Sequence, residues 1–599
     1  MTTPPRVLVP LALAAAMAML YLPRLGSAPI YLAPDEVVVA VDAHAIATTG
    51  RDHFQGRLLP LYFEFRRLLV GHKGVREIRV SWLPPGIFYA VALVLKVLPF
   101  SETWIRLPVA LVGIANVLLL YFIGRRLFAN EALAALSAVL LGLTPAHFIH
   151  SRMAADYLFP VPFMLAWFLC LLAYLEGRRE RQLFAATLCL GLGLYSYAAS
   201  TLMMPIYLLI TFVVLAMERR PARSYLLAAG GFLIPAMLTI PWLILHPTMI
   251  MEVLKKYDLN AEGNLTALQS VRSLFTIHRL GDQIGLYWGF FNPRFLFFDG
   301  PAEPMFSTRQ VGVFLLPVAA LLGAGLYATI RAQVTPVRVV LWLGLLTSPI
   351  AATLVSVSDA IYRALEMLPF VALLAACGAQ ALWLAPSFKP RRGVFLGVGL
   401  AVLAAGVLYA AAILSTQSRM PGGAGVLIAM GALTIFLGLF ASRLRFGQIA
   451  VLGLMVLVPM QFALFYADYF SDYRTRTAIV FSGNIRGAYE EVLKEEPQVQ
   501  PPRIYLGEIG SYSYGGLYWQ FYLIKHGRLD LLDRTINAYL FYPDRVLQLP
   551  PRSLIVTNAG DGPTDIIIDG LVAAGQLTKK AVITEPDGTR TYLVLQRGN

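Results

Sequence analysis

The feature that most constrains the fold is a series of hydrophobic segments separated by short, arginine-containing connections. A helix needs about 20 apolar residues to cross the hydrocarbon layer of a bilayer. Hydrophobic residues make up 57% of the 599 residues and charged residues 14%, whereas a soluble domain has roughly 25% charged residues. The sequence therefore predicts an all-α polytopic membrane protein. Thirteen crossings are expected, over residues 7–23, 105–124, 132–149, 157–175, 183–200, 202–217, 225–245, 310–330, 338–355, 364–385, 394–415, 425–441 and 447–466.

The basic residues predict the topology. Every second connection is rich in arginine or lysine, at residues 125–126, 178–181, 219–223, 331–338, 389–392 and 443–445. The positive-inside rule places these connections in the cytoplasm, and the net charge of +14 is explained by them without a nucleic-acid partner. Three outer regions follow, a first loop of about 24–104, a second of about 246–309, and the chain from about 467 onward.

The segment over residues 84–100 is expected to lie along the membrane surface. It is short, bounded by prolines, and contains Lys96. Counting it as a crossing would place Asp35 in the cytoplasm, on the opposite side from Asp156. An interfacial helix in the first outer loop avoids this. The opening apolar segment resembles a signal peptide, but its length favours an uncleaved first helix.

Residues 467–599 have a different character and predict a small outer α/β domain. "PRIYLGEIG", "SLIVTNAG" and "AVITEPDGTRTYLVLQ" have strand patterns, the last with a Pro-Asp-Gly hairpin turn. "SYGGLYWQFYLIKHG" predicts a helix that ends at Gly527. The expected division is a membrane domain over 1–466 and a periplasmic α/β domain over 467–599. Three cysteines lie inside apolar segments without ligand-like spacing, so neither a disulfide framework nor a metal cluster is expected.

Charged residues next to several crossings are predicted to share one membrane face. A charge in the bilayer centre costs roughly 2.5–3.5 kcal/mol, so their retention at matching depth indicates a polar cavity. Each residue alone could be an interfacial anchor or a helix cap; the combination of acids with arginines favours a site. The arginine fork suits phosphate oxygens, and a carboxylate can accept a proton from an attacking hydroxyl. The set is Asp35, Glu36, Arg106, Arg152, Asp156 and Arg363.

Ordered blocks of the sequence resemble a known family. The blocks are "PDEVVVAVDAHAIATTGRD", "PPGIFYAVALVLKVLPFSETWIRLPVALVGIANVLLLYFIGRRLF" and "SRMAADYLFPVPFMLAWFLCLLAYLEG", with later likenesses in "YWGFFNPRFLFFDGPAEPMFSTRQVGVF" and "DAIYRALEMLPFVALLAACG". They resemble the bacterial glycosyltransferases related to dolichyl-phosphate-mannose protein mannosyltransferases and to the lipid A aminoarabinose transferase. This is glycosyltransferase family 39, with the GT-C fold. The likeness covers about residues 15–385.

The resemblance implies a transferase that moves a sugar, with inversion, from a polyprenyl-phosphate donor to a lipid, glycan or protein acceptor. It implies a multi-pass protein of a bacterial inner membrane with its active site on the periplasmic face. Asp35 matches the acidic motif of the family's first loop and is the expected catalytic base, with Asp156 at a second acidic position. Arg106 and Arg363 match family arginines and are expected at the donor phosphate. Arg152 is also expected at the donor phosphate, and Asp156 is expected as a second catalytic residue that orients the site with Arg152. Glu36 and Tyr362 are expected to support the site.

One departure from the family bears on phosphate and metal binding. Aminoarabinose-transferase-like members have Glu-Lys-Pro before the interfacial helix, where this chain has Trp82-Leu83-Pro84-Pro85. The missing lysine leaves the phosphate to arginines, with Arg79 or Lys73 as further candidates. The alternative for the segment "RRLLVGHKGVREIR", a surface that faces lipid headgroups, is favoured over a phosphate site. The missing acid leaves the use of a divalent metal open. Two alternative functions remain, a transporter or flippase of lipid-linked sugars and a polymerase or ligase of lipid-linked glycans.

Overall fold

The computed structural model describes residues 7–70, 76–256, 269, 277–355, 357–385, 392–414, 422–440, 446–507, 514–538, 543–560 and 562–598. The chain forms two compact units. The helical unit comprises Met1–Pro23, Val109–Arg152 and Asp156–Tyr469, and the mixed unit comprises Arg24–Pro108, Met153–Ala155 and Phe470–Asn599. The first outer loop thus belongs to the same compact unit as the carboxyl-terminal residues. Lys73, one of the further phosphate candidates, lies outside the described residues.

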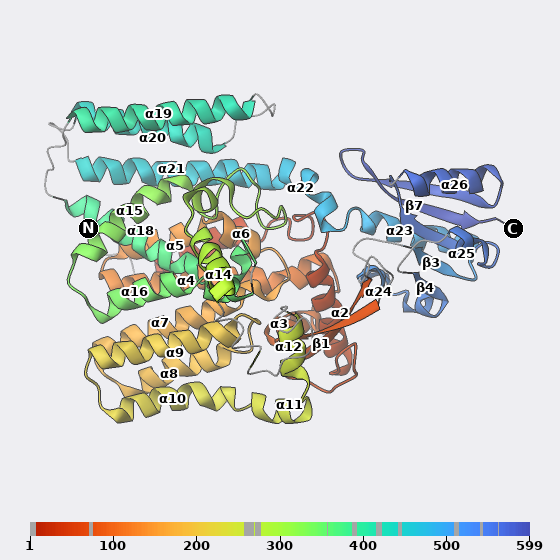
Figure 1. Ribbon diagram of the computed structural model, residues 1–599, viewed down its shortest axis with the longest axis horizontal. Coiled ribbons are helices and arrows are strands. Elements are labelled where there is room, and N and C mark those ends of the chain that lie inside the picture. Colours follow the sequence, from red (N-terminus) through yellow and green to blue (C-terminus); the bar gives the residue numbers. More distant parts are fainter. Residues whose placement is uncertain are drawn as a thin grey trace. The chain divides into compact units, whose positions relative to one another are not determined.

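The helical unit is built from apolar helices that pack side by side (Figure 1). Its elements are α1 (Leu8–Tyr21), most of α4 (Glu102–Phe128), α5 (Glu131–Gly142), α6 (Pro145–His150), η1 (Asp156–Leu158), α7 (Pro160–Gly177), α8 (Glu180–Gly193), α9 (Ser200–Met217), α10 (Ala222–Ala236), α11 (Thr239–Leu245), α12 (Met249–Lys256), α14 (Ile277–Gly289), η2 (Phe295–Asp299), α15 (Leu316–Arg331), α16 (Pro336–Thr347), α17 (Ile350–Leu354), η3 (Ile361–Arg363), α18 (Met367–Leu384), α19 (Arg392–Leu414), α20 (Gly422–Phe440) and most of α21 (Phe446–Phe470). Each of the thirteen predicted crossings overlaps at least one helix, and those over 132–149, 225–245 and 338–355 are each divided between two.

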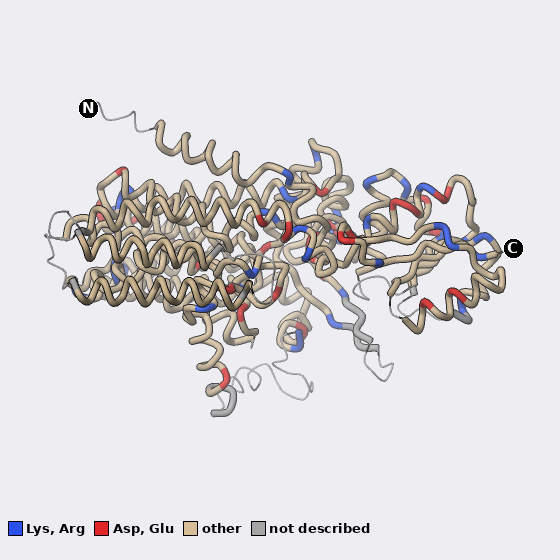
Figure 2. Tube along the Cα trace, turned by 90° about the horizontal axis from the view of Figure 1, so that it is seen from above, with Lys and Arg blue, Asp and Glu red and all other residues tan. Residues whose placement is uncertain are grey.

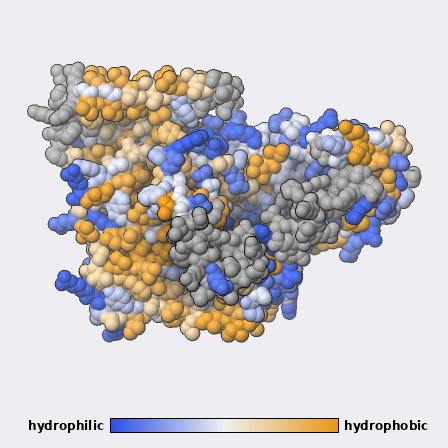
Figure 3. Space-filling model, in the orientation of Figure 1, coloured by the Kyte–Doolittle hydropathy of each residue, from blue (hydrophilic) through white to orange (hydrophobic). Residues whose placement is uncertain are grey.

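The composition of these helices fits a membrane. Among the described residues, seven helices are long and apolar enough to cross one, and α10 with α11, bent by 41°, forms an eighth candidate. Hydrophobic side chains cover much of the visible surface of the helices (Figure 3), and Lys, Arg, Asp and Glu are rare along their lengths (Figure 2). The expectation of a polytopic helical membrane protein is confirmed.

Small residues allow a close contact between two helices of this unit, α15 and α18. A Cβ atom added at Gly325 of α15 would lie 1.8 Å from the carbonyl oxygen of Leu374 in α18, and one at Gly378 would lie 1.9 Å from that of Leu321. Neither position has room for a larger residue. Close backbone approach through small residues is a common means of helix association in membranes.

The mixed unit contains the first outer loop and the carboxyl-terminal α/β fold. The loop contributes α2 (Pro34–Thr49), an antiparallel hairpin of β1 (Phe63–Val70) and β2 (Arg76–Leu83), and α3 (Gly86–Leu95). With ten residues, α3 is too short to cross a bilayer, which agrees with the interfacial helix predicted over 84–100. The hairpin was not predicted; it contains the arginine-rich segment that includes Arg79.

The carboxyl-terminal part is a five-stranded sheet of order β4-β3-β5-β7-β6. Its elements are α22 (Asp472–Arg476), η4 (Ala478–Phe481), α23 (Ile485–Val499), β3 (Ile504–Gly507), α24 (Gly515–His526), η5 (Leu529–Arg534), β4 (Thr535–Ala538), α25 (Pro543–Leu547), β5 (Leu554–Asn558), α26 (Pro563–Ala573), β6 (Leu577–Thr584) and β7 (Arg590–Arg597). Strand β3 is parallel to β4 and β5, and β7 is antiparallel to β5 and β6. The three predicted strand segments and the helix ending at Gly527 are confirmed.

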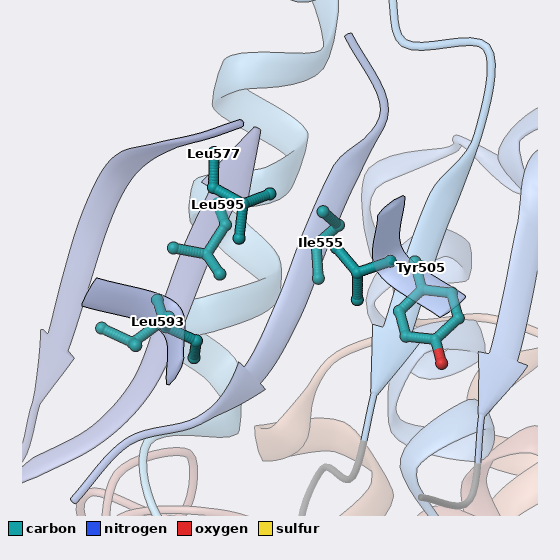
Figure 4. Close-up of a cluster of buried hydrophobic side chains, with 7 residues drawn as sticks. Tyr505, Ile555, Leu577, Leu593 and Leu595 are labelled. Carbon is teal, nitrogen blue, oxygen red and sulfur yellow. The ribbon is translucent and has the colours of Figure 1, made fainter. Parts of the chain in front are cut away.

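Buried side chains hold this sheet against its helices. Tyr505, Ile555, Leu577, Leu593 and Leu595 gather between the strands and the covering helices (Figure 4). Each fully buried aliphatic side chain contributes about 1.5–3 kcal/mol through burial of apolar surface. This core makes the described part of residues 470–599 a folded α/β structure, which confirms the predicted fold of this region.

Helix α24 also packs on α2, and further contacts join α24 to the segments before α2 and at the start of α4. The Tyr518 hydroxyl donates to the Leu32 carbonyl oxygen at 2.7 Å, and the Lys525 ammonium donates to Glu102 at 2.8 Å. The rings of Phe100 and Phe521 lie 4.7 Å apart between centroids. The carboxyl-terminal fold therefore supports the start of α2, where the predicted acidic pair lies.

Candidate active site

The acidic pair Asp35–Glu36 lies in the first turn of α2, and its two side chains have opposite environments. Pro34 is the first residue of the helix, where its fixed φ and missing N–H are tolerated. The Glu36 carboxylate turns back and accepts a hydrogen bond from the Ala33 N–H at 2.8 Å, which caps the helix. Glu36 is completely buried, whereas Asp35 is exposed. Only Asp35 is therefore accessible to a substrate.

A buried ion pair fixes this helix start. Arg106 of α4 is 1% exposed and Glu36 is 0% exposed. The Arg106 Nε and Nη2 atoms donate to the two Glu36 oxygens at 2.7 and 2.9 Å, the bidentate geometry of strong arginine–carboxylate pairs. The Ala154 N–H adds a further bond to Glu36 at 2.8 Å. Segments distant in sequence thus converge on the Glu36 carboxylate.

The remaining donors of Arg106 bind backbone carbonyls of the chain before α2. Nη1 donates to Leu25 at 2.7 Å and to Pro29 at 3.0 Å, and Nη2 donates to Tyr31 at 2.8 Å. An arginine has five N–H donors, and all five of Arg106 have an acceptor. Contact with a substrate phosphate would require breaking one of these bonds, so the geometry favours a positioning role over the predicted phosphate contact.

Arg152 has a comparable structural environment within the helical unit. It is completely buried, and its guanidinium donates to the carbonyl oxygens of Tyr21 and Pro23 at the end of α1. The guanidinium carbon lies 5.4 Å from the ring centre of Phe148 and 5.7 Å from that of Tyr469, within the range of cation–π interactions. Arg152 therefore anchors the end of α1.

Asp156, Tyr362 and Arg363 lie in two short helical turns that contact each other, η1 and η3. All three side chains are half-buried. The guanidinium carbon of Arg363 lies 5.3 Å from the centre of the Tyr362 ring, and the Tyr362 ring lies 5.0 Å from that of Tyr157. The structure thus brings these three predicted site residues together, and unlike Arg106 and Arg152 they are partly accessible.

The prediction from sequence missed a second buried acid on α2. Asp42 is 1% exposed, and its Oδ1 accepts a hydrogen bond from the His53 N–H at 2.8 Å. Burial raises the pKa of Asp42 to about 7, and the nearby Asp52 also raises it. A single acid within the apolar segment "VVVAVDAHAI" was the available signal.

Within the part of the chain that the structure describes, no group of three or more His, Cys, Asp or Glu residues is arranged to hold a metal ion.

Comparisons with known proteins agree with this architecture. Residues 83–245 match the family model described as dolichyl-phosphate-mannose-protein mannosyltransferase. No curated protein sequence matches the chain. Among solved structures, ArnT from Cupriavidus metallidurans bound to undecaprenyl phosphate is similar with a TM-score of 0.52 and 14% identity, covering 98% of this chain and 97% of ArnT.

The apo structure of the same ArnT gives a TM-score of 0.51 at 15% identity, with the same coverage of both chains. At such identities the likeness concerns the fold, and it extends over nearly the whole of both chains. The chain therefore has the GT-C fold, and over residues 83–245 it matches the dolichyl-phosphate-mannose-protein mannosyltransferases, which confirms the resemblance to glycosyltransferase family 39.

Proposed function

We propose that this protein is a membrane glycosyltransferase that transfers a sugar from a polyprenyl-phosphate donor to a lipid, glycan or protein acceptor. The observation that carries the proposal is the asymmetry of the acidic pair. Glu36 is buried and saturated with hydrogen bonds, while Asp35, its neighbour, is exposed on the same rigid helix start. A rigidly held and accessible carboxylate is the arrangement that a general base needs.

In the proposed reaction, Asp35 accepts the proton of the acceptor hydroxyl. The hydroxyl oxygen forms a bond to the anomeric carbon of the donor sugar as the bond from that carbon to the phosphate oxygen breaks. The products are the inverted glycoside, polyprenyl phosphate and a protonated Asp35. Phosphate is a good leaving group, so stabilisation of its charge is needed more than a general acid.

Arg363 is proposed to bind the donor phosphate, and Asp156 and Tyr362 to orient it. The half-buried guanidinium is held over the Tyr362 ring, which restricts its rotamers, and a planar fork suits phosphate oxygens. Arg106 and Arg152 act through positioning, because their guanidinium groups are buried against carbonyl oxygens. Residues 467–599 are proposed to help select the acceptor. The proposed location is a bacterial inner membrane, with Asp35 on the periplasmic side.

The test is release of polyprenyl phosphate. Purified protein in liposomes would be given a panel of undecaprenyl-phosphate sugars, and both free undecaprenyl phosphate and movement of the labelled lipid between leaflets would be measured. Release that is lost in Asp35→Asn supports the transferase. Lipid movement without release would instead support the flippase alternative, and a lengthening lipid-linked glycan would support a polymerase.

A further inference from the structure

The mixed unit contains an open groove of about 460 Å³ between the start of α2 and the carboxyl-terminal sheet. Pro34 forms part of one wall. Residues 479–483, 558–560 and 590–592 supply most of the rest. The volume lies within the range of ligand sites in proteins, about 300–1,000 Å³. The groove is large enough for a small ligand or for one end of a larger one.

The groove lies at the carboxyl end of a parallel strand, where α/β proteins usually bind ligands. Strands β3, β4 and β5 are parallel. Of the groove residues, Asn558 is the last residue of β5, and Ala559 and Gly560 follow it. The other sheet residues of the groove, Arg590, Thr591 and Tyr592, begin β7, the antiparallel neighbour of β5. The groove therefore adjoins the carboxyl end of a parallel strand, and ligands of open α/β sheets bind outside the carboxyl ends of the strands.

The lining combines polar groups with a small apolar face. Ser482, Thr591 and Asn558 bring hydroxyl and amide groups, and Ile479 and Pro34 bring apolar surface. Hydroxyl and amide groups suit the hydroxyls of a sugar, because each can both donate and accept. The apolar residues suit the C–H faces of the same ring. This combination fits a saccharide better than a purely apolar ligand.

Arg590 adds a positive charge at the rim. It is exposed and lines the groove, and none of the ion pairs found among the described residues involves it. Many other exposed arginines of the chain have a carboxylate partner, such as Arg294 with Asp299. A guanidinium without an internal carboxylate is suited to an anionic group of a ligand, either phosphate or carboxylate.

Hydrogen bonds of Glu585, whose carboxylate lies close to Gly483, connect the segment before α2 to the groove wall at residues 479–483. The Glu585 carboxylate accepts hydrogen bonds from the Tyr31 hydroxyl at 3.0 Å and from the Asn484 N–H at 2.6 Å. Tyr31 precedes Pro34 by three residues, and Pro34 is bonded to Asp35. A ligand in this groove would therefore lie beside the segment that carries the proposed base.

We propose that this groove binds an anionic saccharide of the acceptor, with Arg590 contacting its phosphate or carboxylate and Ser482, Asn558 and Thr591 contacting its hydroxyls. The role as acceptor site rests on the proposed function, since only a transferase has an acceptor. The binding itself does not depend on it. The groove would then determine specificity by placing an acceptor hydroxyl near Asp35.

The experiment uses the full-length protein in detergent and ligand-observed NMR. Glucose 6-phosphate, glucuronate, glucose and inorganic phosphate are the probes, and no donor lipid is present. We expect both anionic sugars to bind, and Arg590→Gln to weaken their binding about tenfold, the effect of losing one charge-assisted hydrogen bond. Ile479→Glu should also weaken the binding, because it places a negative charge at the groove, at a position where the native side chain is 62% exposed.

Arg503→Gln is the matched control. Arg503 is exposed and directly precedes β3, at the amino end of the parallel strands, whereas the groove adjoins the carboxyl end of β5. Equal affinity of wild type and Arg590→Gln for both anionic sugars would overturn the proposal. Inorganic phosphate binding as tightly as glucose 6-phosphate would overturn the saccharide assignment. Binding without any release of polyprenyl phosphate in the liposome assay would leave the groove assignment standing and contradict the proposed function instead.

Discussion

Glu36 and Arg106 form a bidentate ion pair that is closed to solvent on both sides, with Nε and Nη2 at 2.7 and 2.9 Å from the carboxylate oxygens. Removing two charges from water is costly, and the cost is recovered here through hydrogen bonds to the Leu25, Pro29 and Tyr31 carbonyl oxygens. A pair of this kind specifies one arrangement of the segments that it joins. It holds the residue next to it, Asp35, in a fixed position.

Breaking the ion pair should destabilise the protein. Loss of one partner of a buried pair costs about 3–5 kcal/mol, because the other charge stays buried. We therefore expect Glu36→Gln and Arg106→Met each to lower the thermal midpoint, and the double variant to lose less than the sum of the two. Glu176→Gln is the control, since its pair with Arg126 is exposed on both sides and should change stability little. Additive losses would show that the pair is not coupled.

Asp35→Asn should lower the rate of transfer strongly without lowering stability. The side chain is exposed, so the substitution removes a proton acceptor and leaves the core unchanged. A positioned general base contributes about 10²–10⁴-fold, and we expect a loss of at least about 100-fold in turnover with donor binding nearly normal. Asp587→Asn, in the exposed β6–β7 turn, is the control. Full activity of Asp35→Asn would move the proposed base to Asp156.

Arg363→Ala should weaken donor binding about 30-fold or more, the usual cost of removing a charge-assisted contact to a buried anion. Lysine should restore little, because it lacks the planar fork. Arg331→Ala is a matched control. The guanidinium carbon of Arg331 also lies over a tyrosine ring, 5.1 Å from the centre of the Tyr327 ring, but Arg331 is at the predicted cytoplasmic end of α15. Binding of undecaprenyl phosphate by the three variants is the measurement. Equal losses in Arg363→Ala and Arg331→Ala would contradict a specific site.

Asp42 should make the stability of the mixed unit depend on pH. Burial raises its folded pKa to about 7, above the unfolded value of about 3.9, so the folded state binds more protons. Its contribution to stability is complete below the unfolded pKa and is lost as the pH rises through about 7. From pH 5 to 8 this loss is at most about 3 kcal/mol. Asp42→Asn should make the thermal midpoint less dependent on pH over that range, whereas Asp35→Asn on the same helix should leave this dependence unchanged. An unchanged pH profile in Asp42→Asn would contradict this.

Removal of the carboxyl-terminal fold should impair α2 as well as acceptor selection. Deleting residues 470–599 removes Tyr518, Lys525 and Glu585, which bond to Leu32, Glu102 and Tyr31. We therefore expect the truncated protein to lose donor hydrolysis together with transfer, although no predicted catalytic residue is deleted. The milder pair Tyr518→Phe and Lys525→Met should reduce both activities in parallel. Unimpaired donor hydrolysis by the truncated protein would show that α2 is stable alone.

The sequence by itself determined the helical membrane fold and much of the carboxyl-terminal sheet. Hydrophobic length is a local property of the chain, so each predicted crossing overlaps at least one helix. The short, proline-bounded segment 84–100 contains only the ten-residue helix α3. The Pro-Asp-Gly turn likewise predicted the β6–β7 hairpin, because turn residues act over a few positions. The adjacent acids 35 and 36 were also predicted to differ in role, since neighbours on a helix point about 100° apart.

Only the tertiary structure decided which charged residues are accessible. Arg106, Arg152 and Arg363 look alike in sequence, each beside an apolar segment, but the first two are buried against carbonyl oxygens and the third is half-buried. Burial and hydrogen-bond saturation depend on segments far apart in the chain, such as Ala154 and Glu36. For the same reason the groove around Arg590 could not be predicted, because its walls come from α2 and from the sheet more than 400 residues later.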